Sequence, residues 1–99
     1  MKRGGCTYML TNTNNSVIYV GVTSGLRARI WEHKTKFYPK SFSAKYNCGK
    51  IVWYECFPSI VEAIDREKQL KGGNRKQKED LVNAMNPEWK DLWDDIQDL

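Results

Sequence analysis

Two short runs of strand-forming residues, separated by an asparagine-rich stretch, constrain the fold of this chain more than any other feature. The first run covers residues 6–10 and the second covers residues 17–22, and three asparagines lie between them in residues 11–16. Asparagine is common in tight turns, and runs of β-branched and aromatic residues on either side of such a turn are typical of a β-hairpin. The chain therefore begins with a predicted hairpin, and its 99 residues leave room for one modest core around it.

The remainder of the chain combines one further strand with helices. Residues 51–57 form a third strand-length apolar run. Favourable helix-starting residues are Ser24, the Ser59–Glu62 capping box, Asn74, and Asn86 before Pro87. The helices are expected to run from 26 to 37, from 59 to 71, from 74 to 85, and from 86 onward. We expect a single α+β domain over residues 1–99, with its core at about 6–93, in which three to four helices flank a small three-stranded antiparallel sheet. The sequence does not give the strand order.

Charge is distributed unevenly along the chain. Residues 1–78 carry fifteen Lys or Arg against five Asp or Glu, a balance of +10, whereas residues 79–99 carry one Lys against seven acids, a balance of −6. A basic body attracts polyanions through phosphate contacts and counterion release. The pattern favours nucleic acid as a partner, with a merely soluble mixed surface as the alternative.

The cysteines and the apolar runs indicate the compartment. Cys6, Cys48 and Cys56 are odd in number and form no C-x-x-C pair, which argues against a disulfide framework and against a zinc site. Cys6 and Cys56 are expected to be buried small hydrophobic residues. Apolar runs are of strand length, too short to span a bilayer. A reducing, cytoplasmic setting without a membrane partner is therefore predicted.

Arg29 and His33 lie four residues apart in the first predicted helix, so they are neighbours on its surface. Both fall on the flank of the apolar stripe made by Leu26, Ile30 and Phe37, and they are expected at the edge of the core. An arginine stem packed over apolar surface beside a satisfied imidazole would explain the pair without any function.

Glu67 lies in the middle of the apolar stripe of the second predicted helix. A carboxylate on the core-facing side of a helix is costly unless it is paired or coordinates a metal. A structural ion pair with Lys71, one turn further on, is the alternative to a functional role.

Tyr8 and Tyr19 lie on the two strands of the predicted hairpin, and antiparallel pairing can bring both hydroxyl groups to one edge of the sheet. Gly21 allows a backbone or ligand to approach closely. Two half-buried tyrosines of a sheet, with no chemical role, are the alternative.

Together these features resemble the GIY-YIG endonuclease family, in particular its small stand-alone bacterial members, which carry a URI-type domain. Residues 19–21, Tyr-Val-Gly, resemble the second motif of the family. Residues 6–8, Cys-Thr-Tyr, stand where the first motif is expected, with Cys6 and Thr7 in place of glycine and isoleucine.

Three later features continue the resemblance, which covers about residues 6–93. Arg29, with His33 four residues on, resembles the family's first helix. Glu67 matches its metal-binding glutamate, and residues 86–92 resemble the ending of the small members.

The resemblance implies a metal-dependent endonuclease that hydrolyses phosphodiester bonds in DNA with Mg²⁺ or Mn²⁺. The catalytic residues implied are Tyr8, Tyr19, Arg29, His33, Glu67 and Asn86. Glu67 would hold the metal, Arg29 would contact the scissile phosphate, and either tyrosine qualifies as the general base. His33 would orient a tyrosine or contact the phosphate. Asn86 would brace the site, although helix capping explains it equally well.

A basic run around Gly72-Gly73 is a candidate phosphate track. Its residues are Lys68, Lys71, Arg75, Lys76 and Lys78. The chain is expected to lack room for a second DNA-reading domain. Cutting in DNA repair or processing is therefore predicted to be non-specific or structure-directed, unless a protein partner supplies sequence specificity. The alternatives are a non-catalytic nucleic-acid-binding module with the same fold, and an interaction domain that docks a basic partner through its acidic C-terminal segment.

Overall fold

The N-terminal hairpin forms as expected in the computed structural model, which describes residues 4–99. Strand β1 (Gly5–Thr11) pairs antiparallel with β2 (Ile18–Thr23), in a register that sets Tyr8 opposite Gly21. The connecting turn uses its asparagines directly. Asn15 adopts a left-handed backbone with φ of 60°, and the Asn12 side chain accepts a hydrogen bond from the Val17 amide at 3.1 Å.

Strand β3 (Lys50–Phe57) pairs antiparallel with the other edge of β1, which gives the strand order β2-β1-β3. All seven residues of the central strand β1 are buried. The predicted three-stranded antiparallel sheet is confirmed, and the order places β2 and β3 at opposite edges.

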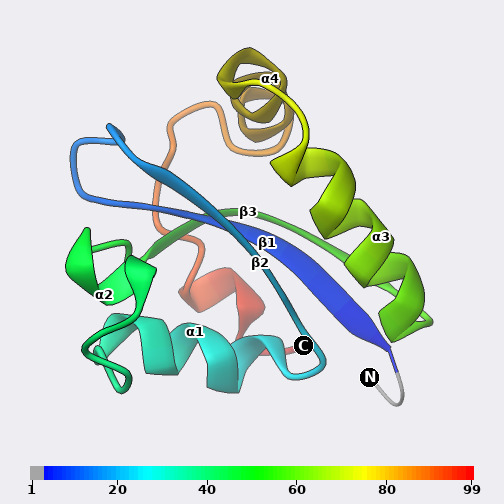
Figure 1. The fold of residues 1–99 in the computed structure, drawn as a ribbon, viewed down its shortest axis with the longest axis horizontal. Coiled ribbons are helices and arrows are strands. Elements are labelled where there is room, and N and C mark those ends of the chain that lie inside the picture. The colour runs from blue at the N-terminus through cyan, green and yellow to red at the C-terminus, as the bar shows by residue number, and fades with distance from the viewer. Residues whose placement is uncertain (1–3) are drawn as a thin grey trace.

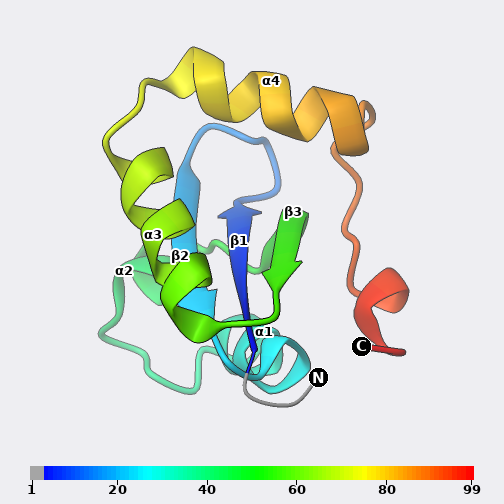
Figure 2. The same cartoon turned by 90° about the vertical axis from the view of Figure 1, so that its right-hand side faces the viewer.

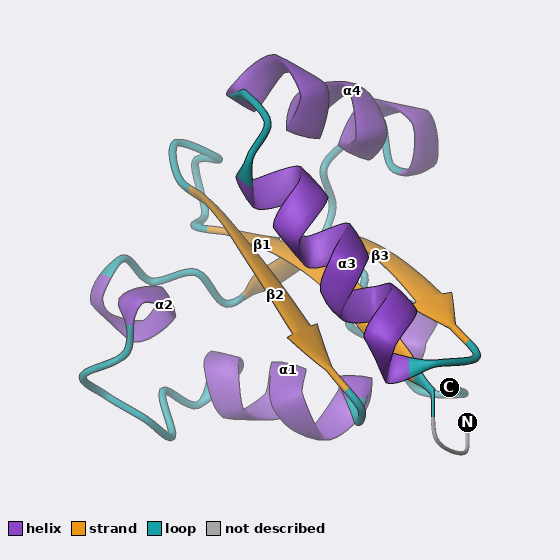
Figure 3. Ribbon diagram, turned by 45° about the vertical axis from the view of Figure 1, so that its right-hand side comes forward, coloured by secondary structure: helices purple, strands orange, loops and turns teal. Residues whose placement is uncertain are grey.

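Helices cover both faces of the sheet (Figure 1 and Figure 3). Alternate residues of β1 divide the core: Tyr8 and Leu10 pack with α1 (Leu26–Lys34) and the C-terminal 3₁₀ turn η1 (Asp94–Ile96), whereas Met9 packs toward α3 (Ile60–Lys71) and α4 (Arg75–Met85). The helices predicted from 59 and from 74 are confirmed, with Ser59 and Asn74 as their N-caps. No helix within residues 4–99 is long and apolar enough to cross a bilayer.

The first helix is shorter than predicted, and a further helix lies in the expected loop. Helix α1 ends at Lys34 because Lys36 takes a left-handed backbone with φ of 54°. Phe37, predicted to lie in the core, is 57 % exposed, and His33 fills that face instead. A short helix α2 (Phe42–Lys45) then forms, with the Ser41 side chain as its N-cap.

The helix predicted from Asn86 does not form. Asn86 Oδ1 accepts from the Lys90 amide at 3.2 Å, and Asn86 Nδ2 donates to the carbonyls of Val52 and Lys90 at 3.1 and 2.8 Å. The bonds to Lys90 close a turn, the bond to Val52 ties that turn to the edge of β3, and the Leu92 amide adds a bond to the Ile51 carbonyl at 2.8 Å. The C-terminal segment thereby covers the β3 edge (Figure 2).

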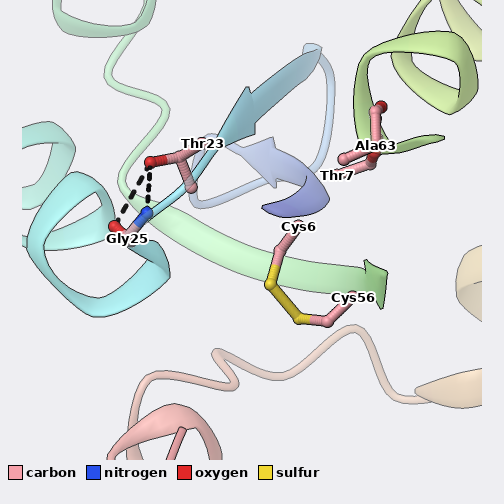
Figure 4. The surroundings of a disulfide bond; sticks show 6 residues. All are labelled: Cys6, Thr7, Thr23, Gly25, Cys56 and Ala63. Carbon is pink, nitrogen blue, oxygen red and sulfur yellow. Dashed lines mark hydrogen bonds between the residues drawn. A yellow bond between two sulfur atoms is a disulfide. The ribbon is translucent and has the colours of Figure 1, made fainter. Parts of the chain in front are cut away.

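The prediction that Cys6 and Cys56 are unpaired is wrong. They stand directly opposite each other on β1 and β3, with Cα atoms 4.0 Å apart, and a disulfide joins them (Figure 4). Cys48 is the free, buried cysteine. An odd cysteine count excludes complete pairing but not a single bond between register partners. The prediction of a reducing compartment is therefore no longer supported by unpaired cysteines.

Candidate functional site

The hydroxyl of Tyr8 reaches the β2 edge of the sheet because Gly21 has no side chain. A carbon added at Gly21 would overlap the ring carbon Cζ and the hydroxyl oxygen of Tyr8. The two residues are cross-strand partners, and the Tyr8 ring, 1 % exposed, covers the glycine. The glycine of the second motif thus determines where the tyrosine of the first motif lies.

Replacing Gly21 with alanine is expected to displace the Tyr8 ring and to lower the free energy of unfolding by about 1–3 kcal/mol, as overpacking of a filled core does. Gly25→Ala is the matched control, because nothing lies within 4 Å of a carbon added there. Denaturant unfolding of both variants checks this. Equal stability of the two variants would contradict the packing described for Tyr8.

His33 connects Tyr8 to the α2 segment. Its Nε2 atom lies 2.8 Å from the Tyr8 hydroxyl and its Nδ1 atom lies 2.6 Å from Ser43 Oγ. All three side chains are buried. Burial, with a further contribution from the positive charge of Arg29, lowers the pKa of His33 to about 4, so the imidazole is neutral at pH 7. Ser43 is a site neighbour without any sequence signal, because a serine in a polar loop is unremarkable.

The pKa of His33 implies acid sensitivity. Its folded value of about 4 lies below the ordinary 6.5, so the unfolded chain takes up the proton first as pH falls. Its contribution to stability is complete above about pH 6.5 and is lost toward pH 4, a change of roughly 3 kcal/mol at 1.36 kcal/mol per pKa unit. Thermal melting at pH 7 and pH 4.5 should show a larger drop for the wild type than for His33→Gln. An equal drop in melting temperature for the two proteins would contradict the lowered pKa of His33.

The second tyrosine completes an aromatic cluster around the imidazole. The Tyr19 ring centroid lies 5.5 Å from that of His33 and 6.5 Å from that of Tyr8. On its other side Tyr19 stacks on Phe42 of α2, with centroids 5.8 Å apart and planes inclined by 25°. Tyr19 is half-buried, whereas Tyr8 is fully enclosed.

Charged side chains of opposite sign shift the pKa of Tyr8 in opposite directions. Its pKa is raised above its ordinary value, chiefly by burial and next by Tyr19; the guanidinium of Arg29 lowers it, and the carboxylate of Glu67 raises it. Arg29 Nη1 donates to Glu32 Oε1 at 2.9 Å, and the Arg29 guanidinium lies 5.6 Å above the ring of Tyr38. Arg29 on α1 and Glu67 on α3 thus act on the same phenol from elements on opposite faces of the sheet.

Glu67 is largely covered but not enclosed. Its side chain is 17 % exposed, between the buried Ala63 and Leu70 of α3, and its Oε2 lies 3.2 Å from Lys71 Nζ. The ion pair that was weighed as an alternative is therefore present, with Lys71 half-exposed. Within residues 4–99 no three His, Cys, Asp or Glu side chains group as metal ligands. A metal here would take one protein carboxylate, with water and substrate oxygens as its other ligands, which suits Mg²⁺.

The structure does not bring Asn86 to this cluster. Its side chain binds Val52 of β3, at the opposite edge of the sheet from Gly21. These hydrogen bonds account for the burial of the Asn86 side chain without a catalytic role.

Most of the predicted phosphate track is engaged within the protein. Arg75 pairs with Glu79 and also donates to the β1–β2 turn, Lys76 pairs with Asp80, and Lys78 donates to the Gly73 carbonyl. Lys68 is exposed. Binding of phosphate by this run remains a prediction.

Comparison with known proteins identifies a family and proteins of similar sequence and fold. A family model described as the GIY-YIG catalytic domain matches residues 4–80. A UPF0213 protein of Haloquadratum walsbyi is 27 % identical over 77 residues, which cover 74 % of this chain and 81 % of that protein. The solution structure of a UPF0213 protein from Bacillus halodurans is similar with a TM-score of 0.54 and 28 % identity, over 90 % of this chain and 93 % of that one.

The family match spans most of the chain and includes β1, β2, α1 and α3, the elements that carry Tyr8, Tyr19, Arg29, His33 and Glu67. The family is generally one of endonucleases. This chain belongs to the GIY-YIG family.

Proposed function

We propose that this protein is an endonuclease that hydrolyses phosphodiester bonds in DNA with a divalent metal ion, Mg²⁺ or Mn²⁺. The observation that carries the proposal is the buried Tyr8 hydroxyl, which lies 2.8 Å from His33 Nε2 and whose pKa is shifted in opposite directions by the guanidinium of Arg29 and the carboxylate of Glu67. Phosphodiester hydrolysis needs this combination of positive charge for the phosphate, an oxygen ligand for a metal, and a group that moves a proton.

Glu67 would hold the metal. Its largely covered carboxylate is an anionic oxygen donor whose charge raises the pKa of Tyr8, and its ion-pair partner Lys71 is half-exposed and so can be displaced. When bound, a divalent ion would neutralise charge on the phosphoryl oxygens and on the leaving oxygen.

Arg29 would bind the scissile phosphate. Its side chain is 30 % exposed, and the guanidinium presents several donors, of which Nη1 is engaged by Glu32. A phosphate oxygen can accept from the remaining donors while Tyr38 supports the guanidinium plane from below.

Tyr8 and His33 would move the proton together. The Tyr8 oxygen would take a proton from the attacking water as its own phenolic proton moves along the 2.8 Å contact to Nε2 of His33. Because burial and Arg29 disfavour the imidazolium, the proton on His33 would return to Tyr8 as Tyr8 gives up the proton taken from water to the leaving oxygen. Ser43 holds Nδ1 and so fixes the direction of the imidazole. The raised pKa of Tyr8 favours this concerted route over a free phenolate.

The basic charge of residues 1–78 supports DNA as the substrate, bound through its backbone and therefore with little sequence preference. Structure-directed or non-specific action in DNA repair or processing, with a protein partner supplying any sequence specificity, fits such binding.

Purified protein is expected to nick supercoiled plasmid when Mg²⁺ or Mn²⁺ is present and to stop when a chelator removes it. DNA affinity measured in the chelator should persist and should fall steeply with salt. Binding of this kind without nicking under any metal would reject the nuclease and leave a non-catalytic nucleic-acid-binding module. A flat salt response would instead favour a protein-interaction domain.

A further inference from the structure

Exposed aromatic side chains gather in one segment, residues 31–46, which runs from the end of α1 through α2 and forms one corner of the molecule (Figure 1). Within residues 4–99 no exposed aromatic residue lies elsewhere. We call this set the aromatic platform. Its members, each between 41 and 57 % exposed, are Trp31, Phe37, Tyr38, Phe42 and Tyr46.

The platform rings pack in two groups, one on either side of residues 39–41, and every ring stays partly exposed. Centroids lie 6.0 Å apart for Trp31 and Phe37, 5.0 Å for Phe37 and Tyr38, and 4.6 Å for Phe42 and Tyr46. This packing leaves each ring 41–57 % exposed. Several exposed apolar side chains gathered on one segment mark a binding site more often than chance exposure does.

Lysines interleave with these rings. Lys36, Lys40 and Lys45 are exposed, and Lys45 Nζ lies 5.5 Å from the centroid of the Tyr46 ring. Lysine is depleted at the centres of protein–protein interfaces, whereas aromatic rings within a basic surface are typical of proteins that bind single-stranded nucleic acid. The charge thus favours a polyanion with stackable bases as the occupant over a protein or a second copy of this chain.

The platform is continuous with the candidate catalytic cluster at two points. Phe42 stacks on Tyr19, and Tyr38 lies under the guanidinium of Arg29. Bases bound on the platform next to these two contacts would lie near the phosphate position at Arg29. A DNA strand bound to the platform would therefore be the strand presented for cutting; the segment that carries the platform lies beside the end of β2 from which Tyr19 comes (Figure 3).

We propose that the aromatic platform binds unpaired bases of DNA by stacking, so that the preferred substrate contains a single-stranded segment. The cutting part of this proposal rests on the proposed nuclease function, but the binding part does not. Duplex DNA keeps its bases stacked inside the helix and offers the platform only its backbone.

The test measures binding in a chelator, where nothing is cut. Labelled oligothymidylate should bind more tightly than a duplex of equal length. Phe37→Leu and Tyr46→Leu keep apolar bulk but remove the ring, and each should weaken oligothymidylate binding by about tenfold, within the range known for base–aromatic stacking. Duplex binding should change less than about twofold, because backbone contacts dominate it. Phe37→Tyr keeps the ring face and should bind as the wild type does.

Met85→Ala is the control, because Met85 is an exposed apolar residue of α4 outside the platform, and it should change neither affinity. Unaltered oligothymidylate binding by both leucine variants, or equal losses on single strand and duplex, would overturn the proposal. A dimer of the wild type that dissociates in Phe37→Leu, seen by sedimentation, would overturn it in favour of a second copy. Ring-dependent binding by a protein that cuts no DNA would support the platform and reject only the nuclease.

Discussion

Glu67→Gln is expected to abolish nearly all DNA cleavage, a loss of several orders of magnitude, while the fold and the DNA affinity persist. The substitution preserves the length and hydrogen-bonding capacity of the side chain and removes the charge that would hold a divalent ion. Loss of a dominant electrostatic element of a site costs about 10²–10³ in rate for a single donor, and loss of the metal should cost more. Plasmid nicking under saturating Mg²⁺ measures the effect.

The stability of Glu67→Gln separates the catalytic role from a structural one. Its ion pair with Lys71 joins residues one helical turn apart, and Lys71 is 51 % exposed, so breaking the pair should cost less than about 1 kcal/mol. The loss of several kcal/mol that a fully buried pair would suffer does not apply here. Thermal melting of the same preparation therefore should show a folded, inactive protein.

Lys71→Gln provides the matched control because it breaks the same ion pair from the other side. If Glu67 served only to hold Lys71, both variants would lose the same activity. We expect Lys71→Gln to keep cleavage within about tenfold of the wild type, since only an exposed cation is lost. A folded Glu67→Gln protein that cuts at the wild-type rate would refute the catalytic assignment.

The parts of the fold that follow from local chemistry were predictable from the sequence. Asparagines at the hairpin turn and the caps at Ser59 and Asn74 each act through neighbouring residues, and each appears where it was expected. The position of Glu67 on the sheet-facing side of α3 followed from the helical period in the same way.

The features that depend on distant residues were not predictable. Periodicity placed Phe37 in the core, but the helix ends before it, because Lys36 takes a left-handed backbone that no single-sequence rule specifies. Asn86 is a good N-cap by type, yet its side chain binds Val52, 34 residues away. The disulfide between Cys6 and Cys56 follows from the pairing of β1 with β3, and the strand order was not available from the sequence.

The candidate site also combines features that the sequence predicts with features that depend on the three-dimensional structure. Tyr8, Tyr19, Arg29, His33 and Glu67 could be selected by family resemblance, but their roles depend on geometry. Only the structure shows that Tyr8 is enclosed and bonded to His33 while Tyr19 is half-buried. This difference in burial and hydrogen bonding distinguishes the two tyrosines, which the sequence alone left equivalent.

Tyr8→Phe is expected to lower the rate of DNA cleavage by about 10²–10⁴-fold, the usual contribution of a general base, whereas Tyr19→Phe should lower it by less than about tenfold. Tyr8 carries the hydroxyl that contacts Nε2 of His33, so phenylalanine removes the proposed proton path entirely. The Tyr19 ring stacks on Phe42, and phenylalanine preserves that stacking.

The stability of the two variants must be measured beside their activity, because Tyr8→Phe leaves a buried imidazole nitrogen without its partner. That vacancy should lower the free energy of unfolding by about 1–3 kcal/mol, so cleavage is compared at a temperature where both variants are fully folded. Under those conditions a folded Tyr8→Phe that retains wild-type activity would remove Tyr8 from the mechanism. A large loss of activity in Tyr19→Phe with a small loss in Tyr8→Phe would assign the proton-accepting role to Tyr19. In that case His33→Gln should cut nearly as fast as the wild type, because no hydrogen bond joins His33 to the Tyr19 hydroxyl in the part of the chain that the structure describes.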